Sequence, residues 1–236
     1  VSNGKTTAIS TDTLPGITVD PLAELRSAAG KEAIKGNRPA RINGIQFSAD
    51  GQQAAIQWRS VDNKDRWIAS VSLETPTLKP LHRLTDNAWI NWNFNDFGWL
   101  PDNRTLWLLS EESGYSHLYT VDARGKTKAL TSGAWEASDP QVSADGSRFL
   151  FICNRQWPGD YELCAKDLRG GSVRELTAFD GVESFSQSPD GQSLLISYSQ
   201  SHLPTQLATM PAQGGDARVL TNSRSEAYAK IDWPAP

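Results

Sequence analysis

The chain has 236 residues, of which 38% are hydrophobic and 21% are charged, so it is long enough to bury a sizeable core. No apolar run approaches the roughly 20 residues that a membrane-spanning helix requires, which excludes such a helix in this sequence. The formal net charge of −4 argues against binding to nucleic acid or to an anionic membrane, so small molecules or peptides are the expected partners.

The first 39 residues precede a series of repeats. Residues 1–19 look like the remainder of an earlier repeat unit. The segment VDPLAELRSAAGKEA predicts a helix over residues 20–29, with Asp20 as its N-cap and Gly30 at its C-terminal end. Such an insertion can pack on the rim of the domain or reach a substrate-binding cavity, and we favour the rim.

Four repeats follow. Aligning the sequence on an Asp-Gly or Asp-Asn pair gives spacings of 52, 43 and 45 residues between turns at Asp50, Asp102, Asp145 and Asp190. Each unit closes with a similar motif, which reads HRLTD, KALTS, RELTA or RVLTN. A period in the forties, made of strand-length runs between turn residues, is typical of propeller blades rather than of a helical solenoid.

The third repeat shows the strand pattern of one blade most clearly. Its four expected strands are Ala137 to Ser143, Arg148 to Asn154, Tyr161 to Asp167 and Val173 to Thr177. We therefore predict an all-β fold, a partial β-propeller of about four four-stranded blades with a short inserted helix. The blades are expected over residues 40–85, 93–131, 137–177 and 182–221.

The sequence contains no recognisable catalytic constellation. It lacks the Gly-x-Ser-x-Gly elbow of an α/β-hydrolase and a Gly-rich phosphate loop. Ser116 and His117 are adjacent, but neighbours on a strand point to opposite faces and cannot form a nucleophile–base pair. His82, His117 and His202 are not spaced as zinc ligands, so we expect no metal and no other cofactor. We interpret His117 as a structural hydrogen-bonding residue.

Two further segments hold candidate residues. Glu111 and Glu112 directly follow a predicted strand and are expected in the next hairpin, with one of them exposed. The segment WINWNFNDFGW at 89–99 contains three Trp and two Phe, more than one inner strand needs. It can pack in the wedge between blades or face a central channel and contact a ligand, and both alternatives stay open. The candidates for a substrate cavity are Trp92, Phe94 and Phe97.

Cys153 and Cys164 are the only cysteines. A hairpin centred on Pro158 and Gly159 would place them opposite each other on adjacent strands, with Cα atoms about 4.5–5.5 Å apart. We therefore expect them to be neighbours. Whether they form a disulfide depends on the compartment, since export favours the bond and the cytosol leaves two buried thiols.

The stretch LSEESGYSHLYTVDARGKTKALTSGAWEASDP resembles the propeller of the dipeptidyl peptidase IV branch of the prolyl oligopeptidase family of serine peptidases. In that branch a Ser-Glu-x-x-Gly-aromatic-x-His-aliphatic-Tyr stretch precedes Leu-Thr-x-Gly-x-Trp and an acidic residue. The Ser-Pro-Asp-Gly blades are less specific, because the Tol-system periplasmic propeller shares them. The motif residues that we interpret as structural are Glu111, Glu112, Tyr115, His117, Tyr119 and Trp135.

The resemblance implies a propeller that covers an α/β-hydrolase domain and filters substrates by size. In the dipeptidyl peptidases, two glutamates of a helical insertion in an earlier blade hold the amino terminus of the substrate. Glu111 and Glu112 belong to a hairpin instead, and the helix at 20–29 carries only Glu24, so no residue is assigned to that role. No catalytic residue can be carried over either.

The domain organisation expected from the resemblance has three parts. Residues 1–39 would hold the remainder of a preceding blade and the inserted helix, and residues 40–223 the four blades. Residues 224–236, which include AYAKIDWPAP, look like the start of the connection to a C-terminal hydrolase domain.

The function implied by the resemblance is that of the propeller portion of a serine exopeptidase, of the dipeptidyl or acylaminoacyl peptidase type. This portion would gate and help bind short peptides, without catalytic activity of its own, in a periplasmic or otherwise exported enzyme. The peptide would be cleaved in the hydrolase domain, and a homo-oligomer is a further expectation. The alternative is a non-catalytic, Tol-system-like propeller that binds a protein partner; the motif GYSHLY and the ending DWP favour the peptidase.

Overall fold

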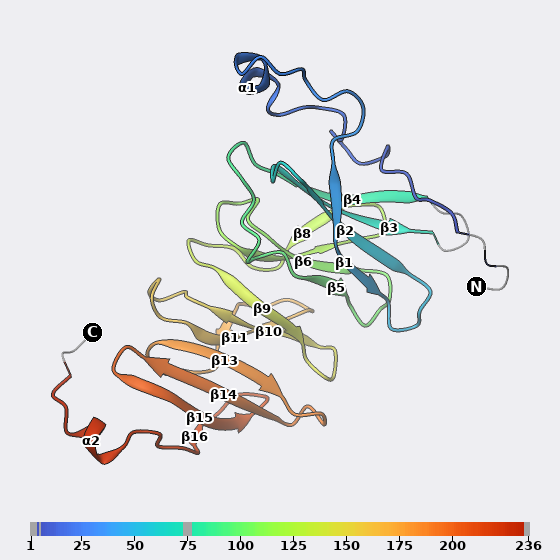
Figure 1. The fold of residues 1–236 in the computed structure, drawn as a ribbon. Coiled ribbons are helices and arrows are strands. Elements are labelled where there is room, and N and C mark those ends of the chain that lie inside the picture. Colours follow the sequence, from blue (N-terminus) through green and yellow to red (C-terminus); the bar gives the residue numbers. More distant parts are fainter. Residues whose placement is uncertain (1–3, 5, 73–76, 234–236) are drawn as a thin grey trace. The chain divides into compact units, whose positions relative to one another are not determined.

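The computed structural model describes residues 4, 6–72 and 77–233, and the remainder of the predicted connection, residues 234–236, lies outside them. The described residues form four antiparallel sheets of four strands each (Figure 1). In every sheet, strands that are consecutive in the sequence are neighbours, which is the meander of a propeller blade. The predicted fold class, a partial β-propeller with a short inserted helix, is confirmed.

The chain divides into two compact units. The first contains Val1–Glu112 and Tyr119–Ala129, and the second contains Ser113–Leu118 and Leu130–Pro236. The first sheet consists of β1 (Ala40–Phe47), β2 (Ala54–Ser60), β3 (Asp65–Val71) and β4 (Leu78–Thr85). The second sheet consists of β5 (Phe97–Trp99), β6 (Leu106–Ser110), β7 (His117–Val121) and β8 (Thr127–Ala129).

The core of the first unit lies on both faces of the first sheet. On one face, Ile68 and Leu81 pack with Leu108 and Tyr119 of the second sheet. On the other face, the fully buried Trp67 packs with residues that precede the sheet, Leu14 and Ile17 among them. Residues 6–19, expected to be the remainder of a blade, form turns in the structure and cover this face.

The inserted helix is shorter than predicted. It is α1 (Ala23–Ala28), none of its residues is buried, and it projects from the first sheet (Figure 1). Asp20 does not act as the N-cap residue; its carboxylate accepts hydrogen bonds from the backbone N–H of Leu22 and of Ile34. Gly30 ends the helix as predicted, since it adopts φ +67° and the Lys31 N–H bonds back to the Arg26 carbonyl.

The second unit contains the last two sheets. The third sheet consists of β9 (Ala137–Val142), β10 (Arg148–Cys153), β11 (Glu162–Asp167) and β12 (Arg174–Glu175). The fourth consists of β13 (Val182–Gln187), β14 (Ser193–Gln200), β15 (Leu203–Pro211) and β16 (Arg218–Val219), followed by α2 (Glu226–Ala229). One apolar cluster joins these sheets, with Ile152 and Leu163 from the third packed on Ile196 and Met210 from the fourth. No helix in the described part of the chain is long and apolar enough to cross a membrane.

The repeated Asp-Gly turns explain why the four sheets could be located from the sequence. In the third sheet the Gly146 N–H bonds to the Ser143 carbonyl, and Gly146 adopts φ +68°. Gly51 and Gly191 adopt φ +69° at the corresponding positions, and Asn103 adopts φ +56°. Glycine and asparagine are the residues that tolerate this left-handed conformation best, so the turn has a strong local signal.

Candidate functional site

The aromatic segment 89–96 is attached to the first sheet by Asn95. The Asn95 side-chain oxygen accepts a hydrogen bond from Nη1 of Arg66 at 2.7 Å, and its backbone carbonyl accepts one from Nε2 of Gln57 at 2.7 Å. Its side-chain amide donates to the Asn91 carbonyl within the segment. Because Asn95 is buried, these bonds fix the path of the segment over β2 and β3.

Of the three cavity candidates, Trp92 has the most specific surroundings. Its indole is half-buried, with the Arg59 guanidinium 4.5 Å from the ring centroid. Its Nε1–H donates to the side-chain oxygen of Asn63. These contacts hold the ring in one orientation while part of its surface stays accessible.

The other two candidates differ from each other in burial. Phe94 is half-buried, like Trp92. Phe97 starts β5 and is only 7% exposed, within the apolar cluster between the first two sheets. It also lies against Gly44, where an added Cβ would be 3.0 Å from its ring. Phe97 is therefore a core residue. The expectation that Phe97 lines a substrate cavity together with Trp92 and Phe94 is corrected.

A buried arginine lies beneath the aromatic segment. Arg66 of β3 is fully buried and donates from Nη1 to Asn95 and to the Leu109 carbonyl at 2.8 Å. Burial lowers the pKa of Arg66 to about 10, against the opposing effect of the charges of Glu112 and Glu111. The guanidinium therefore stays charged at neutral pH. Its Nε and Nη2 have no hydrogen-bond partner among the described residues.

Glu111 and Glu112 lie in the turn between β6 and β7, as predicted, with Glu112 exposed. The Glu112 carboxylate is 2.7 Å from Nε2 of His82 and 3.2 Å from the Ser110 hydroxyl. The hydrogen bond from His82 lowers the pKa of Glu112, whereas burial lowers the pKa of His82. His82 is therefore neutral at pH 7 and donates its Nε2–H to a charged carboxylate.

Two cationic or polar side chains of this site were missed from the sequence, Arg66 and Asn95. Arg66 shares a strand face with the buried Ile68, and a charged residue at such a position was an available signal. The role of Asn95 had no comparable signal, because its partner Arg66 is 29 residues away in the sequence, on β3.

The GYSHLY motif is held by hydrogen bonds in the second unit. The Ser116 hydroxyl donates to the Ala137 carbonyl at 2.8 Å. The ring of His117 contacts the Thr131 hydroxyl and the Gly133 carbonyl, each at 3.0 Å, and meets the Trp135 ring edge to face. Burial lowers the pKa of His117, so the neutral ring donates one hydrogen bond and accepts the other. This arrangement is that of a structural histidine.

The remaining motif aromatics differ in exposure. Tyr119 and Trp135 are buried, at 5% and 9% exposure, whereas Tyr115 is 43% exposed in the turn before β7. Tyr119 packs in the cluster between the first two sheets, and Trp135 stacks on Phe151. The Tyr119 and Trp135 positions therefore serve packing, and Tyr115 offers surface.

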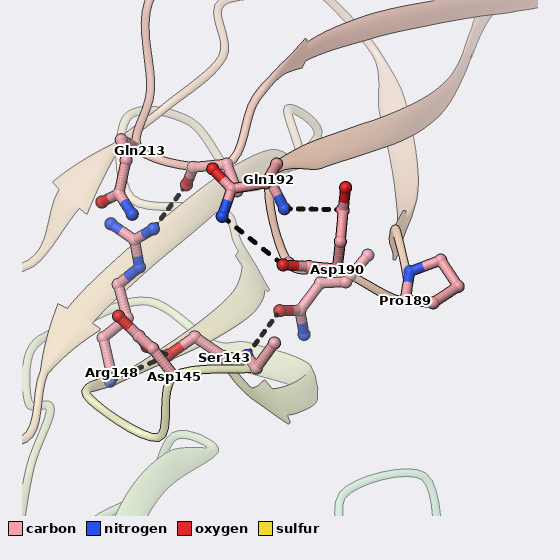
Figure 2. Close-up of a pocket in the computed structure, with 11 residues that line it drawn as sticks. Ser143, Asp145, Arg148, Pro189, Asp190, Gln192 and Gln213 are labelled. Atoms are coloured by element: carbon pink, nitrogen blue, oxygen red, sulfur yellow. Dashed lines mark hydrogen bonds between the residues drawn. The ribbon is translucent and has the colours of Figure 1, made fainter.

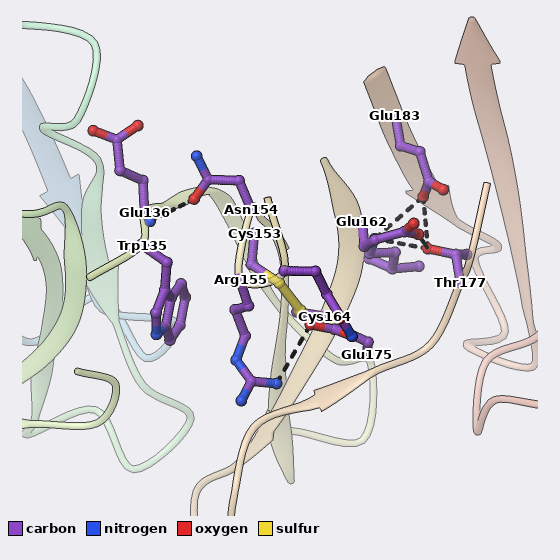
Figure 3. The surroundings of a disulfide bond; sticks show 12 residues. Trp135, Glu136, Cys153, Asn154, Arg155, Glu162, Cys164, Glu175, Thr177 and Glu183 are labelled. Carbon is purple, nitrogen blue, oxygen red and sulfur yellow. Dashed lines mark hydrogen bonds and ion pairs between the residues drawn. A yellow bond between two sulfur atoms is a disulfide. The ribbon is translucent and has the colours of Figure 1, made fainter. Parts of the chain in front are cut away.

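Cys153 and Cys164 form a disulfide, with their Cα atoms 6.0 Å apart (Figure 3). The predicted register was wrong, because Cys153 pairs with Glu162 and Cys164 pairs with Phe151. The cysteines are thus diagonal neighbours rather than opposite ones, since the hairpin is centred one residue before the predicted position. Glu175 lies close to both sulfurs, but sulfurs joined to each other are not thiolate ligands for a metal.

Two buried carboxyl groups meet at the start of β11, that of Glu162 from β11 itself and that of Glu183 from β13. The Thr177 hydroxyl is 2.7 Å from the Glu162 carboxyl and 2.8 Å from the Glu183 carboxyl (Figure 3). Burial raises the pKa of both groups, and the charge of Glu162 contributes to raising that of Glu183, to about 8. Neither group was singled out from the sequence.

Comparisons with known proteins show which family and which solved structures this chain resembles. The model of the dipeptidyl peptidase IV (DPP IV) N-terminal region matches residues 31–205, which is more than half of the chain. The solved structure of dipeptidyl peptidase 4 from Porphyromonas gingivalis superposes with a TM-score of 0.68 and 18% identity, over 86% of this chain and 29% of that one. A candidate dipeptidyl aminopeptidase IV from Bacteroides ovatus ATCC 8483 gives a TM-score of 0.67 and 17% identity, over 84% and 32%.

TolB from Acinetobacter baumannii is similar at a lower level, with a TM-score of 0.53 and 19% identity over 83% of this chain and 47% of that one. The chain thus spans less than half of the length of each of these structures. At these identities the superpositions show the fold, whereas the family model covers the first three repeats, part of the fourth and the GYSHLY motif. The chain belongs to the family of the dipeptidyl peptidase IV N-terminal region.

Proposed function

We propose that this chain is the propeller portion of a serine peptidase of the dipeptidyl peptidase IV type, and that it gates and helps bind short peptides. The observation that carries the proposal is the match of the family model over residues 31–205. The peptidase structures that resemble the chain are about three times as long, which leaves room for a hydrolase domain in a protein of that length.

The residues that would contact the peptide are in the aromatic segment 89–96. Trp92 supports this role best, because Arg59 and Asn63 orient its ring and the ring is still partly accessible. An oriented, partly exposed aromatic ring can bind apolar side chains at a low cost in conformational entropy. Phe94, which is half-buried in the same segment, is the second candidate.

The test uses the protein encoded by the complete gene and the chromogenic substrate Gly-Pro-p-nitroanilide. Trp92→Ala should raise KM about 3- to 10-fold and leave kcat within about twofold, because it removes a binding contact and no reacting group. The matched control is Trp89→Ala, since Trp89 lies in the same segment but is 61% exposed. Absence of any peptidase activity, or an unchanged KM in Trp92→Ala, would contradict the proposal.

The alternative function is that of a Tol-system-like module that binds a protein partner. The fold similarity to TolB supports it, but it does not account for the match of the family model. The gene sequence beyond Pro236 distinguishes the two. A Gly-x-Ser-x-Gly segment roughly a hundred residues downstream supports the peptidase, and its absence favours the binding module.

A further inference from the structure

A pocket of about 300 Å³ lies between the Asp-Gly turns of the third and fourth sheets (Figure 2). Both turns have the same internal hydrogen bonds. Ser143 donates its hydroxyl hydrogen to Asp145, and Ser188 donates to Asp190, as Ser48 does to Asp50 in the first sheet. The two aspartates that line the pocket are therefore explained by the turn itself, and they are not evidence of a ligand.

Three other residues of the pocket depart from the repeat pattern. Arg148 is the first of them: its carbonyl accepts the hydrogen bond that closes the turn, a position occupied by Gln53, Thr105 and Ser193 in the other sheets. An arginine occurs at this position only in the third sheet. The pocket therefore contains a charge that the turn does not require.

Gln187 and Gln213 are the other two pocket residues that differ from the repeat pattern. Gln187 stands before the turn of the fourth sheet, where the other sheets have Phe47, Trp99 and Val142. Gln213 follows the third strand of its sheet, where Arg124 and Arg169 occur in the second and third sheets. These three positions correspond because the next residue in each sheet makes the same turn bond. The backbone N–H of Gly125, Gly170 and Gly214 donates to the carbonyl three residues earlier. All three departures line one pocket.

Arg148 has unused hydrogen-bonding capacity. Its side chain is buried, at 4% exposure, and Nη2 donates to the Ala212 carbonyl at 2.6 Å. Nε has no partner among the described residues, and no carboxylate of that part of the chain forms an ion pair with the guanidinium. In Figure 2 the guanidinium lies beside the side chain of Gln213, which also makes no hydrogen bond to the described residues. A buried guanidinium with free donors favours a planar anion such as a carboxylate.

The charges of the turns restrict the size and charge of that anion. Hydrogen bonds lower the pKa of Asp145 to about 2 and also lower that of Asp190, so both are ionised at neutral pH. They oppose a phosphate dianion but accept hydrogen bonds from a neighbouring amine or amide. The volume is at the low end for ligand pockets and suits a molecule of the size of an amino acid or dipeptide.

We propose that this pocket binds the terminal carboxylate of an amino acid or a short peptide, with the carboxylate on Arg148 and an N–H group of the ligand directed to Asp145 or Asp190. The site is separate from the aromatic segment, and its existence does not depend on the proposed peptidase function. Free amino acids and peptide carboxyl termini share the recognised group.

The test is isothermal titration calorimetry of the 236-residue chain with alanine, alanyl-alanine and alanyl-alanine amide. We expect saturable binding of alanine, of alanyl-alanine or of both, and the tighter of the two identifies the source of the carboxylate. The amide, which lacks the carboxylate, should bind about 10- to 100-fold more weakly, as expected for the loss of a charge-assisted hydrogen bond. Arg148→Gln, which introduces the residue of the first sheet, should weaken binding to the same extent.

Arg169→Gln is the matched control, because Arg169 is exposed at a turn of the same unit, and it should bind as the unchanged chain does. Should Arg148→Gln fail to fold, Gln213→Glu changes an exposed residue and places a competing carboxylate beside Arg148, so it should also weaken binding at least about tenfold. The proposal is overturned if neither alanine nor alanyl-alanine binds, or if alanyl-alanine amide binds as tightly as alanyl-alanine. It is also overturned if folded Arg148→Gln, or Gln213→Glu in its place, binds as tightly as the unchanged chain.

Discussion

The carboxyl groups of Glu162 and Glu183 are both within hydrogen-bond distance of one hydroxyl group, that of Thr177. Their Oε2 atoms are 2.7 and 2.8 Å from its Oγ1. A hydroxyl group has one hydrogen to donate, so it can donate to only one of the two carboxylates. The second contact needs a carboxyl group that itself carries a proton. The geometry and the raised pKa of Glu183 therefore agree that this buried pair holds a proton at neutral pH.

The first prediction concerns the pH dependence of stability. The pKa of Glu183 is raised in the folded state, so its favourable contribution is complete below the unfolded value of about 4.5 and is lost as the pH rises through about 8. The free energy of unfolding should therefore fall between pH 5 and 8.5, and Glu183→Gln should reduce this fall. Urea unfolding followed by Trp fluorescence measures it.

Asp216→Asn is the control for this prediction, because Asp216 is an exposed acid of the same unit. It should keep the pH dependence of the unchanged chain. If the free energy of unfolding falls as steeply between pH 5 and 8.5 in Glu183→Gln as in Asp216→Asn, the Glu162–Glu183 pair does not retain its proton.

The second prediction concerns the disulfide between Cys153 and Cys164. Its residues are 11 positions apart, and closing a loop of that size in the unfolded chain is expected to contribute about 2–4 kcal/mol. Reduction should lower the free energy of unfolding by that amount, as measured by urea unfolding with and without dithiothreitol. The double variant Cys153→Ala, Cys164→Ala should not respond to the reductant, and equal stability of the oxidised and reduced chain would argue against the bond.

The third prediction concerns Asn95. Asn95→Ala removes the acceptor of Arg66 and leaves a buried charged donor with one partner fewer, which should cost about 1–3 kcal/mol of stability. Amide hydrogen exchange of residues 89–96 should also become faster, because the segment loses its attachment to the sheet. Asn93→Ala, at an exposed position of the same segment, should change neither quantity. Unchanged exchange in Asn95→Ala would assign the attachment to other contacts.

The fourth prediction concerns the hydrogen bonds of the GYSHLY motif. The Thr131 hydroxyl contacts the ring of His117 and accepts from the Leu118 N–H at 2.9 Å, within a buried environment. Thr131→Val keeps the shape of the side chain but removes the hydroxyl partner of the His117 ring and of the Leu118 N–H. It should therefore lower the free energy of unfolding by about 1–3 kcal/mol. Thr120→Val, which removes a long and exposed bond, should have a smaller effect. Equal losses in the two variants would refute the structural role of Thr131.

The parts of the fold that were predictable have local causes. The Asp-Gly turns at Gly51, Gly146 and Gly191 require a left-handed residue, so the repeat could be read directly from the sequence. The register of Cys153 and Cys164 was missed because it depends on how the loop after β10 folds, which the residues Pro158 and Gly159 do not determine.

The candidate site was less predictable, because its contacts join residues distant in the sequence. Phe97 could not be distinguished from Trp92 by composition, since both are aromatic residues of one segment and only packing between the sheets separates them. Arg148 was different: comparison of the four repeats shows it as an exception, although only the structure places Gln187 and Gln213 at the same pocket.

The proposal that this chain is the non-catalytic propeller portion of a serine peptidase can be tested by covalent labelling of serine. A fluorescent fluorophosphonate, which reacts with activated serines, is applied both to the 236-residue chain and to the product of the complete gene. We expect the gene product to be labelled and the 236-residue chain to stay unlabelled, because Ser116 donates to a backbone carbonyl and the His117 ring is engaged by Thr131 and Gly133. Labelling of the 236-residue chain, or no labelling of the gene product, would refute the proposed function.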